Sequence, residues 1–180
     1  MRSKWLAITF LASIVASCSS PNSQAGSPSE AIEQIRALAG FTESELTFIE
    51  TTEMANSPHG DLKVDLYQDE EGRKFYVEPG TRIVVEIDAR NLMGIRSANM
   101  GSTLTSAQLE EEARKLILAA VPEFSSFENS LQCETGEKVD IFFYDCREPI
   151  DQGAFTPRFI QVGFMTDGEM FGYINTVSIP

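Results

Sequence analysis

Leu62-Lys63-Val64-Asp65-Leu66-Tyr67 is the stretch of this sequence that decides its fold. Apolar residues alternate here with polar ones, and this period of two is typical of a β-strand with one buried face. Turn-forming residues follow at 69–72 and 79–80, and they separate further strand-like segments at 74–78 and 82–88. Strands joined by such short turns predict an antiparallel sheet.

Two amphipathic helices are predicted, each ahead of a run of strands. The first begins at Ser27-Pro28-Ser29-Glu30, which has capping-box spacing, and it ends near Gly40. The second begins after Thr105, which stands three residues before Gln108 as in a capping box, and it ends at Pro122. The predicted strands after the second helix cover 127–133, 138–146, 157–166 and 169–178, with Asp167-Gly168 as a hairpin turn.

The order of elements is therefore a helix followed by strands, repeated once. Lys63-Val64-Asp65-Leu66-Tyr67 also matches Lys138-Val139-Asp140-Ile141-Phe142, which suggests an internal repeat. We predict an α+β fold of two related helix-plus-antiparallel-sheet units, α-β-β-β twice. The first unit covers residues 28–100 and the second covers residues 101–180.

A strand-and-turn motif adds a family resemblance. Phe75-Tyr76-Val77-Glu78-Pro79-Gly80-Thr81 resembles the aromatic-Val-acid-Pro-x-Thr segment of the PepSY-like repeats of exported bacterial proteins, with 82–85 as the closing strand. The second unit departs from this pattern, because it has Phe159-Ile160-Gln161-Val162-Gly163 and no Pro-x-Thr turn. The resemblance implies a non-catalytic module that modulates peptidases or binds other envelope proteins, and it supplies no catalytic residues.

The N-terminus has the layout of a secretory leader. Arg2 and Lys4 precede the apolar run 5–15, which is too short to span a membrane. Val15-Ala16-Ser17-Cys18 resembles the lipobox of bacterial lipoproteins. The resemblance implies that residues 1–17 are removed, that the Cys18 sulfur takes a diacylglycerol, and that the new amino terminus receives an acyl chain such as palmitate. A plain secretory signal and an uncleaved anchor are the alternatives.

Residues 18–27 then form a polar linker that carries the domain away from the lipid surface. The predicted location is outside the cytoplasm, with the lipid anchor in the bacterial cell membrane or the outer membrane. Ser19 follows the lipidated cysteine in place of the aspartate associated with inner-membrane retention. The sequence is therefore compatible with transfer of the protein to the outer membrane.

The composition is strongly acidic. Without residues 1–17 the chain loses two of its 14 basic residues and none of its 27 acidic ones, so its formal charge is 12 − 27 = −15. This excess argues against nucleic acid or anionic lipid as a partner, because phosphate recognition needs clusters of lysine and arginine. Solubility explains the acidity, and attraction to a basic partner surface is the alternative.

Cys133 and Cys146 are the two cysteines left besides Cys18. In an exported domain a structural disulfide between them is favoured. If Gly136 and Glu137 form the hairpin turn, however, Cys133 faces Asp140, and Cys146 lies about 20 Å further along the strand. Either the strand breaks early and the bond forms, or the two sulfurs stay apart.

Residues with catalytic chemistry do not form a recognisable motif. The sequence has one histidine, His59, in a polar loop, and it has no metalloprotease, nucleophile-elbow, phosphate-loop or dinucleotide-binding pattern. Glu110-Glu111-Glu112 fits the favourable end of a helix dipole better than a binding site. We therefore predict no enzyme activity, no catalytic residue, no cofactor and no metal site.

Aromatic residues are the most suggestive cluster. Ile141-Phe142-Phe143-Tyr144 is apolar on both faces of its strand, which a sheet covered on one side does not require. Phe142, Tyr144, Phe171 and Tyr173 are therefore a candidate binding patch. The alternative is that one face packs on the helix and the other on the first unit.

Three functions remain to be distinguished at this point. A protein-binding or regulatory module, with another envelope protein as its partner, predicts an exposed patch on the second sheet. A small-ligand or lipid carrier predicts an enclosed apolar cavity between helix and sheet. An enzyme predicts polar groups that converge in a pocket. The sequence favours the protein-binding module.

Overall fold

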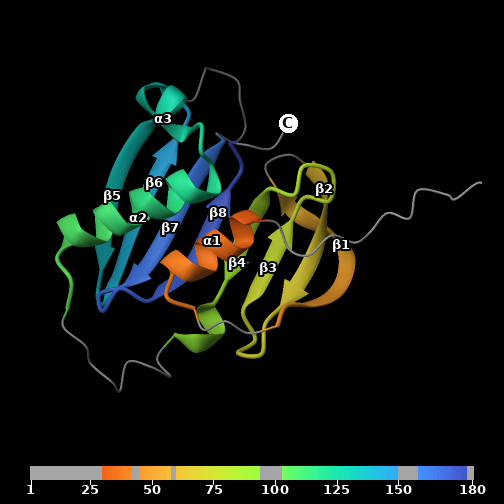
Figure 1. Ribbon diagram of the computed structural model, residues 1–180. Coiled ribbons are helices and arrows are strands. Elements are labelled where there is room, and N and C mark those ends of the chain that lie inside the picture. The colour runs from red at the N-terminus through yellow and green to blue at the C-terminus, as the bar shows by residue number, and fades with distance from the viewer. Residues whose placement is uncertain (1–29, 42–44, 58–59, 94–102, 150–157, 178–180) are drawn as a thin grey trace, which may run out of the picture.

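One sheet of eight antiparallel strands forms the body of this computed structural model, which describes residues 30–177 except for 42–44, 58–59, 94–102 and 150–157. The strand order is β1-β2-β3-β4-β8-β7-β6-β5 (Figure 1). The strands are β1 (Thr47–Ser57), β2 (Gly60–Gln68), β3 (Lys74–Val77), β4 (Val84–Asp88), β5 (Gln132–Lys138), β6 (Ile141–Arg147), β7 (Phe159–Met165) and β8 (Met170–Asn175). The predicted leader, Cys18, the linker and the predicted boundary at residue 100 lie outside the described residues.

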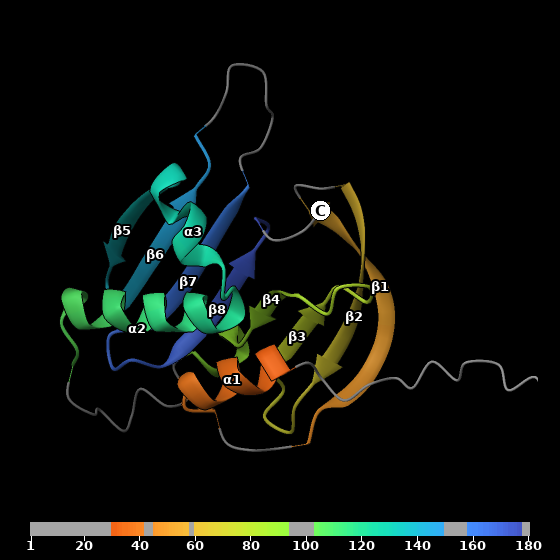
Figure 2. The same cartoon turned by 45° about the horizontal axis from the view of Figure 1, so that its top comes forward.

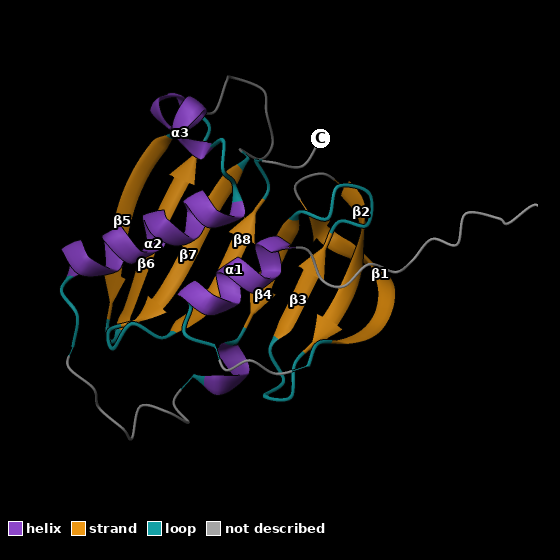
Figure 3. Cartoon of the chain, in the orientation of Figure 1, coloured by secondary structure: helices purple, strands orange, loops and turns teal. Residues whose placement is uncertain are grey.

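Two helices lie side by side on one face of this sheet (Figures 1 and 2). They are α1 (Glu30–Leu38) and α2 (Ser106–Ala120); the short elements are η1 (Arg90–Leu92), α3 (Phe124–Phe127) and η2 (Glu128–Ser130). Strands outweigh helices throughout the described chain, as the colouring by secondary structure shows (Figure 3). The described helices are all too short or too polar to cross a membrane.

The predicted fold class, two separate α-β-β-β units, is wrong. β4 pairs with β8 through Glu86–Ile174, Ile87–Tyr173 and Asp88–Gly172, so all eight strands belong to one continuous sheet. Pairing satisfies backbone groups that two separate sheets would leave exposed at these edges. The result is a sheet-dominated fold in which one face carries both helices.

The main hydrophobic core lies between the helices and the sheet. α1 contributes Ile32 and Ile35, and α2 contributes Leu109, Ala113, Leu116 and Ile117, all at 2% exposure or less. Their spacing of three and four residues places them on one side of each helix. The strand residues of the same core include Phe75, Val77, Ile87, Phe142, Tyr144, Ile160, Val162, Phe164 and Tyr173.

The sequence match taken as a repeat does not correspond to equivalent structure. Lys63–Tyr67 lies inside β2, whereas Val139 and Asp140 form the turn between β5 and β6. Asp140 has φ 60°, a left-handed conformation that aspartate tolerates better than most residues. The predicted turn at Gly136-Glu137 is therefore wrong as well, and so is the strand predicted over 127–133, because α3 and η2 occupy most of that range.

The predicted start of the second helix is confirmed. The Thr105 side chain accepts a hydrogen bond from the Gln108 backbone N–H, and the Gln108 side chain accepts one from the Thr105 backbone N–H. The predicted hairpin turn at Asp167-Gly168 is also present between β7 and β8, with Gly168 at φ +92°. Local signals of this kind depend on a few adjacent residues, which is why they could be read directly.

A buried ion pair closes the turn between β2 and β3. Arg73 donates to Asp69 at 2.7 Å, and both side chains are fully buried. Asp69 also accepts from the backbone N–H groups of Glu71 and Arg73, at 3.0 and 2.9 Å. The guanidinium lies 4.0 Å from the ring centroid of Phe41, just after α1. This cluster fixes α1 to the turn.

Candidate functional site

The predicted aromatic patch is not exposed. Phe142, Tyr144, Phe171 and Tyr173 are exposed by 1%, 3%, 7% and 0%. Three of them belong to the core under the helices. Phe171 lies over Gly163, where a Cβ atom would come within 2.5 Å of its ring, and its ring meets Phe143 edge-on at 5.5 Å. These side chains stabilise the sheet, and Phe171 and Tyr173 also line a small pocket of about 210 Å³ with Phe143.

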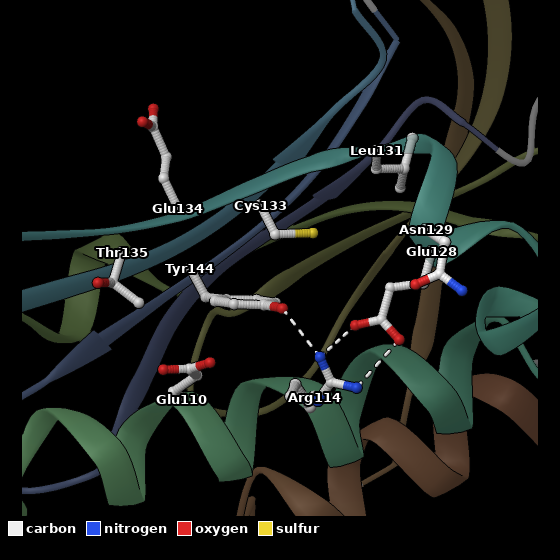
Figure 4. Close-up of a pocket in the computed structure, with 9 residues that line it drawn as sticks. All are labelled: Glu110, Arg114, Glu128, Asn129, Leu131, Cys133, Glu134, Thr135 and Tyr144. Carbon is white, nitrogen blue, oxygen red and sulfur yellow. Dashed lines mark hydrogen bonds and ion pairs between the residues drawn. The ribbon is translucent and has the colours of Figure 1, made fainter.

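A polar pocket of about 710 Å³ lies between α2 and the β5–β6 hairpin. Figure 4 shows Arg114 of α2 at its centre, turned toward Glu128 of η2 and Tyr144 of β6. Arg114 Nη2 donates to Glu128 Oε2 at 3.0 Å, its Nη1 donates to Glu128 Oε1, and Nη1 also reaches the Tyr144 hydroxyl at 3.3 Å. The remaining lining residues are Glu110, Asn129, Leu131, Cys133, Glu134 and Thr135.

The charges of this pocket are coupled. The carboxylate of Glu128 raises the pKa of Arg114 by accepting its hydrogen bonds. Burial raises the pKa of Tyr144, and the hydrogen bond from Arg114 offsets part of this effect. Glu110 and Glu134 have no ion-pair partner within 4.0 Å among the described residues, so the pocket retains an excess of negative charge.

The predicted disulfide is present in the pocket wall. Cys133 and Cys146 face each other across β5 and β6, with their Cα atoms 4.0 Å apart. The turn at Val139–Asp140, three residues later than predicted, is what brings them into register. Cys146 is fully buried, whereas Cys133 is exposed. The bond therefore ties an exposed strand to the core.

β5 forms one edge of the sheet, and all seven of its residues are exposed. It pairs with β6 in an uninterrupted register. The short Cα distance at Cys133–Cys146 is that of a non-hydrogen-bonded pair, in which the backbone N–H and C=O groups point away from the partner strand. Because this pattern alternates along a strand, the backbone N–H and C=O groups of Cys133, Thr135 and Glu137 all point outward. No described strand pairs with them.

The other edge of the sheet, β1, is less regular. Its pairing with β2 shifts register between Phe48 and Glu50, and again between Met54 and Ser57. Such irregularities are one of the usual means by which natural sheets prevent further strand addition. β5 is therefore the edge better suited to accept another strand.

Other predicted site residues are placed as follows. His59 and Cys18 lie outside the described residues. Glu111 and Glu112 each pair with Lys115 at 3.0 Å on the exposed side of α2, whereas Glu110 lines the pocket. Within the described chain, three or more potential metal ligands nowhere gather into one group.

Sequence reasoning missed the central residues of the pocket. Arg114 is one of several charged positions on an amphipathic helix, and Glu128 falls in a range predicted as strand. Glu134 and Thr135 belong to a strand without a hydrophobic alternation. The spacing of Glu110 and Arg114 by four residues was the one available signal, because it places both on one helix face.

Comparison with known proteins gives no relative for this chain. No family model, no curated protein and no solved structure matches it. The resemblances to bacterial lipoproteins and to PepSY-like repeats stay predictions from the sequence.

Proposed function

We propose that this protein is a non-enzymatic lipoprotein of the bacterial cell envelope that binds another envelope protein through β5. The observation that carries the proposal is the exposed, regular edge of β5, whose outward backbone groups lie beside a charged pocket. An exposed strand edge of this kind is a common site for adding a peptide segment of a partner. The lipobox-like Val15–Cys18 segment supports the location.

The two rival functions find less support. A carrier needs an enclosed apolar cavity between helix and sheet, whereas the pocket of about 570 Å³ between the start of α2 and the β5–β6 turn is lined by polar residues such as Ser106 and Glu137 as well as by apolar ones. An enzyme needs reactive groups that converge on a substrate, whereas the described lining of the pocket includes no histidine or serine, Cys133 is held in a disulfide, and its two unpaired carboxylates, Glu110 and Glu134, lie on different faces of β5. Glu128 is already engaged by Arg114. Both observations favour a binding module.

Photo-cross-linking in cells tests the proposal. A photoreactive residue replaces Thr135 on β5 in the membrane-anchored chain, and Glu53 on β1 serves as the matched control at the other edge. We expect one recurrent envelope protein to be captured from position 135 and not from position 53. Glu137→Pro, which removes a second outward N–H that β6 does not use, should abolish the capture from position 135 without unfolding the sheet. Equal capture from both edges would contradict the proposal.

The proposed anchor has a separate test. Cys18→Ser removes the sulfur that would carry the diacylglycerol, so we expect the protein to leave the membrane fraction. The mass of the mature wild-type chain should begin at Cys18 and exceed the polypeptide mass by the lipid. A wild-type chain that keeps residues 1–17 and carries no lipid would show instead that the leader is an uncleaved anchor.

A further inference from the structure

The faces of β5 differ in a way that constrains what can bind to it. Consecutive residues of a strand point to opposite faces. Thr135 lies on the face toward α2, above Glu110, whereas Glu134 points away from the helix (Figure 4). A ninth strand laid along β5 would follow the same alternation. Two adjacent residues of that strand would therefore each meet a carboxylate, one on each face.

Among the described residues, no cation forms a direct ion pair with either carboxylate. Arg114 is engaged by Glu128 and Tyr144. On the opposite face, Arg147 pairs with Asp145 at 2.5 Å. Glu134 attracts Arg147 only from a greater distance and forms no ion pair with it. An incoming strand with positive side chains at both positions gains two favourable contacts, and one with negative side chains meets repulsion on both faces.

A second copy of the chain is a poorer occupant than a basic segment. Each mature copy carries a formal charge of −15, so two copies repel each other as they approach. The same charge attracts a basic partner and speeds the encounter.

We infer that β5 binds an extended peptide segment with two adjacent lysine or arginine residues, which adds to the sheet as a ninth strand. The inference rests on the proposed function and specifies the chemistry of the partner. The backbone hydrogen bonds come from Cys133, Thr135 and Glu137, and the choice of basic residues comes from Glu110 and Glu134.

Hydrogen exchange with defined peptides tests the inference on the full, membrane-anchored chain in phosphatidylcholine vesicles, whose zwitterionic surface does not attract basic peptides. The probes are Thr-Val-Lys-Lys-Val-Thr, Thr-Val-Glu-Glu-Val-Thr, and the lysine peptide with alternate amides N-methylated. At saturation, the lysine peptide should slow exchange of the Thr135 and Glu137 amides by about tenfold. The glutamate and N-methylated peptides should leave it unchanged.

Charge variants complete the test. Glu110→Gln combined with Glu134→Gln should weaken binding of the lysine peptide by about tenfold, because both carboxylates are lost. Glu50→Gln combined with Glu53→Gln makes the same charge change on β1 and should have no effect. The requirement for two adjacent basic residues would be contradicted if the lysine and glutamate peptides bound equally well. It would also be contradicted if the β5 double variant bound the lysine peptide with unchanged affinity.

The remaining outcomes separate this inference from the proposed function. Cross-linking from position 135 without peptide protection of Thr135 and Glu137 would leave a binding module but overturn strand addition. Protection of these amides that grows with protein concentration, without peptide, would identify a second copy as the occupant and overturn the basic segment. If neither the cross-link from position 135 nor the peptide protection were observed, both the inference and the proposed function would be contradicted.

Discussion

Arg73 and Arg114 are two arginines with similar partners in opposite settings. Arg73 pairs with Asp69 and Glu71 and lies over the ring of Phe41. Arg114 pairs with Glu128 and contacts Tyr144. The side chain of Arg73 is fully buried, whereas that of Arg114 is 41% exposed.

Burial decides the consequence of each pair. Around Arg73, water is excluded, so the charges depend on each other and the cluster holds a turn and a helix together. Around Arg114, solvent screens the charges, so the pair contributes little to stability. The same ion chemistry is thus buried in one half of the sheet and solvent-exposed in the other.

The largest expected effect is at the buried arginine. Arg73→Leu should lower the free energy of unfolding by about 3–5 kcal/mol, because it leaves the Asp69 carboxylate buried without its cation. Urea denaturation measures the loss. Arg90→Leu is the matched control, since Arg90 pairs with Asp88 at the surface with its side chain 65% exposed. It should cost less than about 1 kcal/mol. If the two variants lost a similar free energy of unfolding, burial would not explain the difference between the two ion pairs.

The disulfide ranks next. Cys133→Ala combined with Cys146→Ala should lower the free energy of unfolding by about 3 kcal/mol, the value expected for a closed loop of this length. Because β5 is exposed along its whole length, its amides should exchange first and those of β7 should remain protected. Hydrogen exchange followed by mass spectrometry resolves the two strands. Protection of β5 that survives the double substitution would show that pairing with β6 alone holds the edge.

Arg114→Gln should destabilise the fold by no more than about 1 kcal/mol, because its ion pair is half-exposed. Its clearer effect is on Tyr144. Arg114 lowers the pKa of this phenol, so its removal should raise the Tyr144 pKa further. Ultraviolet titration measures the change, and Tyr67, whose pKa burial also raises, is the internal reference. An unchanged Tyr144 pKa would mean that the two groups are not coupled.

The smallest effects are expected at β4, where two carboxyl groups shift in opposite directions. Burial raises the pKa of Glu86, and the Arg90 hydrogen bond lowers that of Asp88. Glu86→Gln should therefore stabilise the protein at pH 7 by less than about 1 kcal/mol, with the gain disappearing as pH falls below about 4.

Asp88→Asn should have the opposite sign. It should destabilise the protein at pH 7, and the loss should vanish as pH falls through the lowered folded-state pKa of Asp88. Thermal unfolding of both variants between pH 3 and 7 measures the two trends. Parallel trends in the two variants would contradict the assigned pKa directions.

The sequence predicted elements better than their assembly. The Thr105–Gln108 capping box and the Asp167-Gly168 turn were readable because each depends on neighbouring residues. The turn between β5 and β6 was misplaced because Gly136 is a stronger turn signal than Val139, although Asp140 accepts the positive φ that the turn needs. Register, and with it the disulfide, depended on that choice.

Local sequence patterns could not predict the candidate site. Arg114, Glu128 and Tyr144 come from a helix, a 3₁₀ turn and a strand, and only their packing brings them together. The aromatic residues carried the strongest sequence signal for a binding patch, yet an inner strand of a covered sheet needs such residues for its core. Hydrophobicity alone does not distinguish a core from a surface patch.

By itself, the sequence determined the strand alternation, the Thr105–Gln108 helix cap and the acidic balance, because these follow from composition and from the identities of nearby residues. Only the tertiary structure decided that β4 joins β8, that the aromatic residues are buried, and that β5 is left as a regular free edge beside a charged pocket. These features arise from contacts between residues far apart in the chain, whose free energy no local pattern encodes.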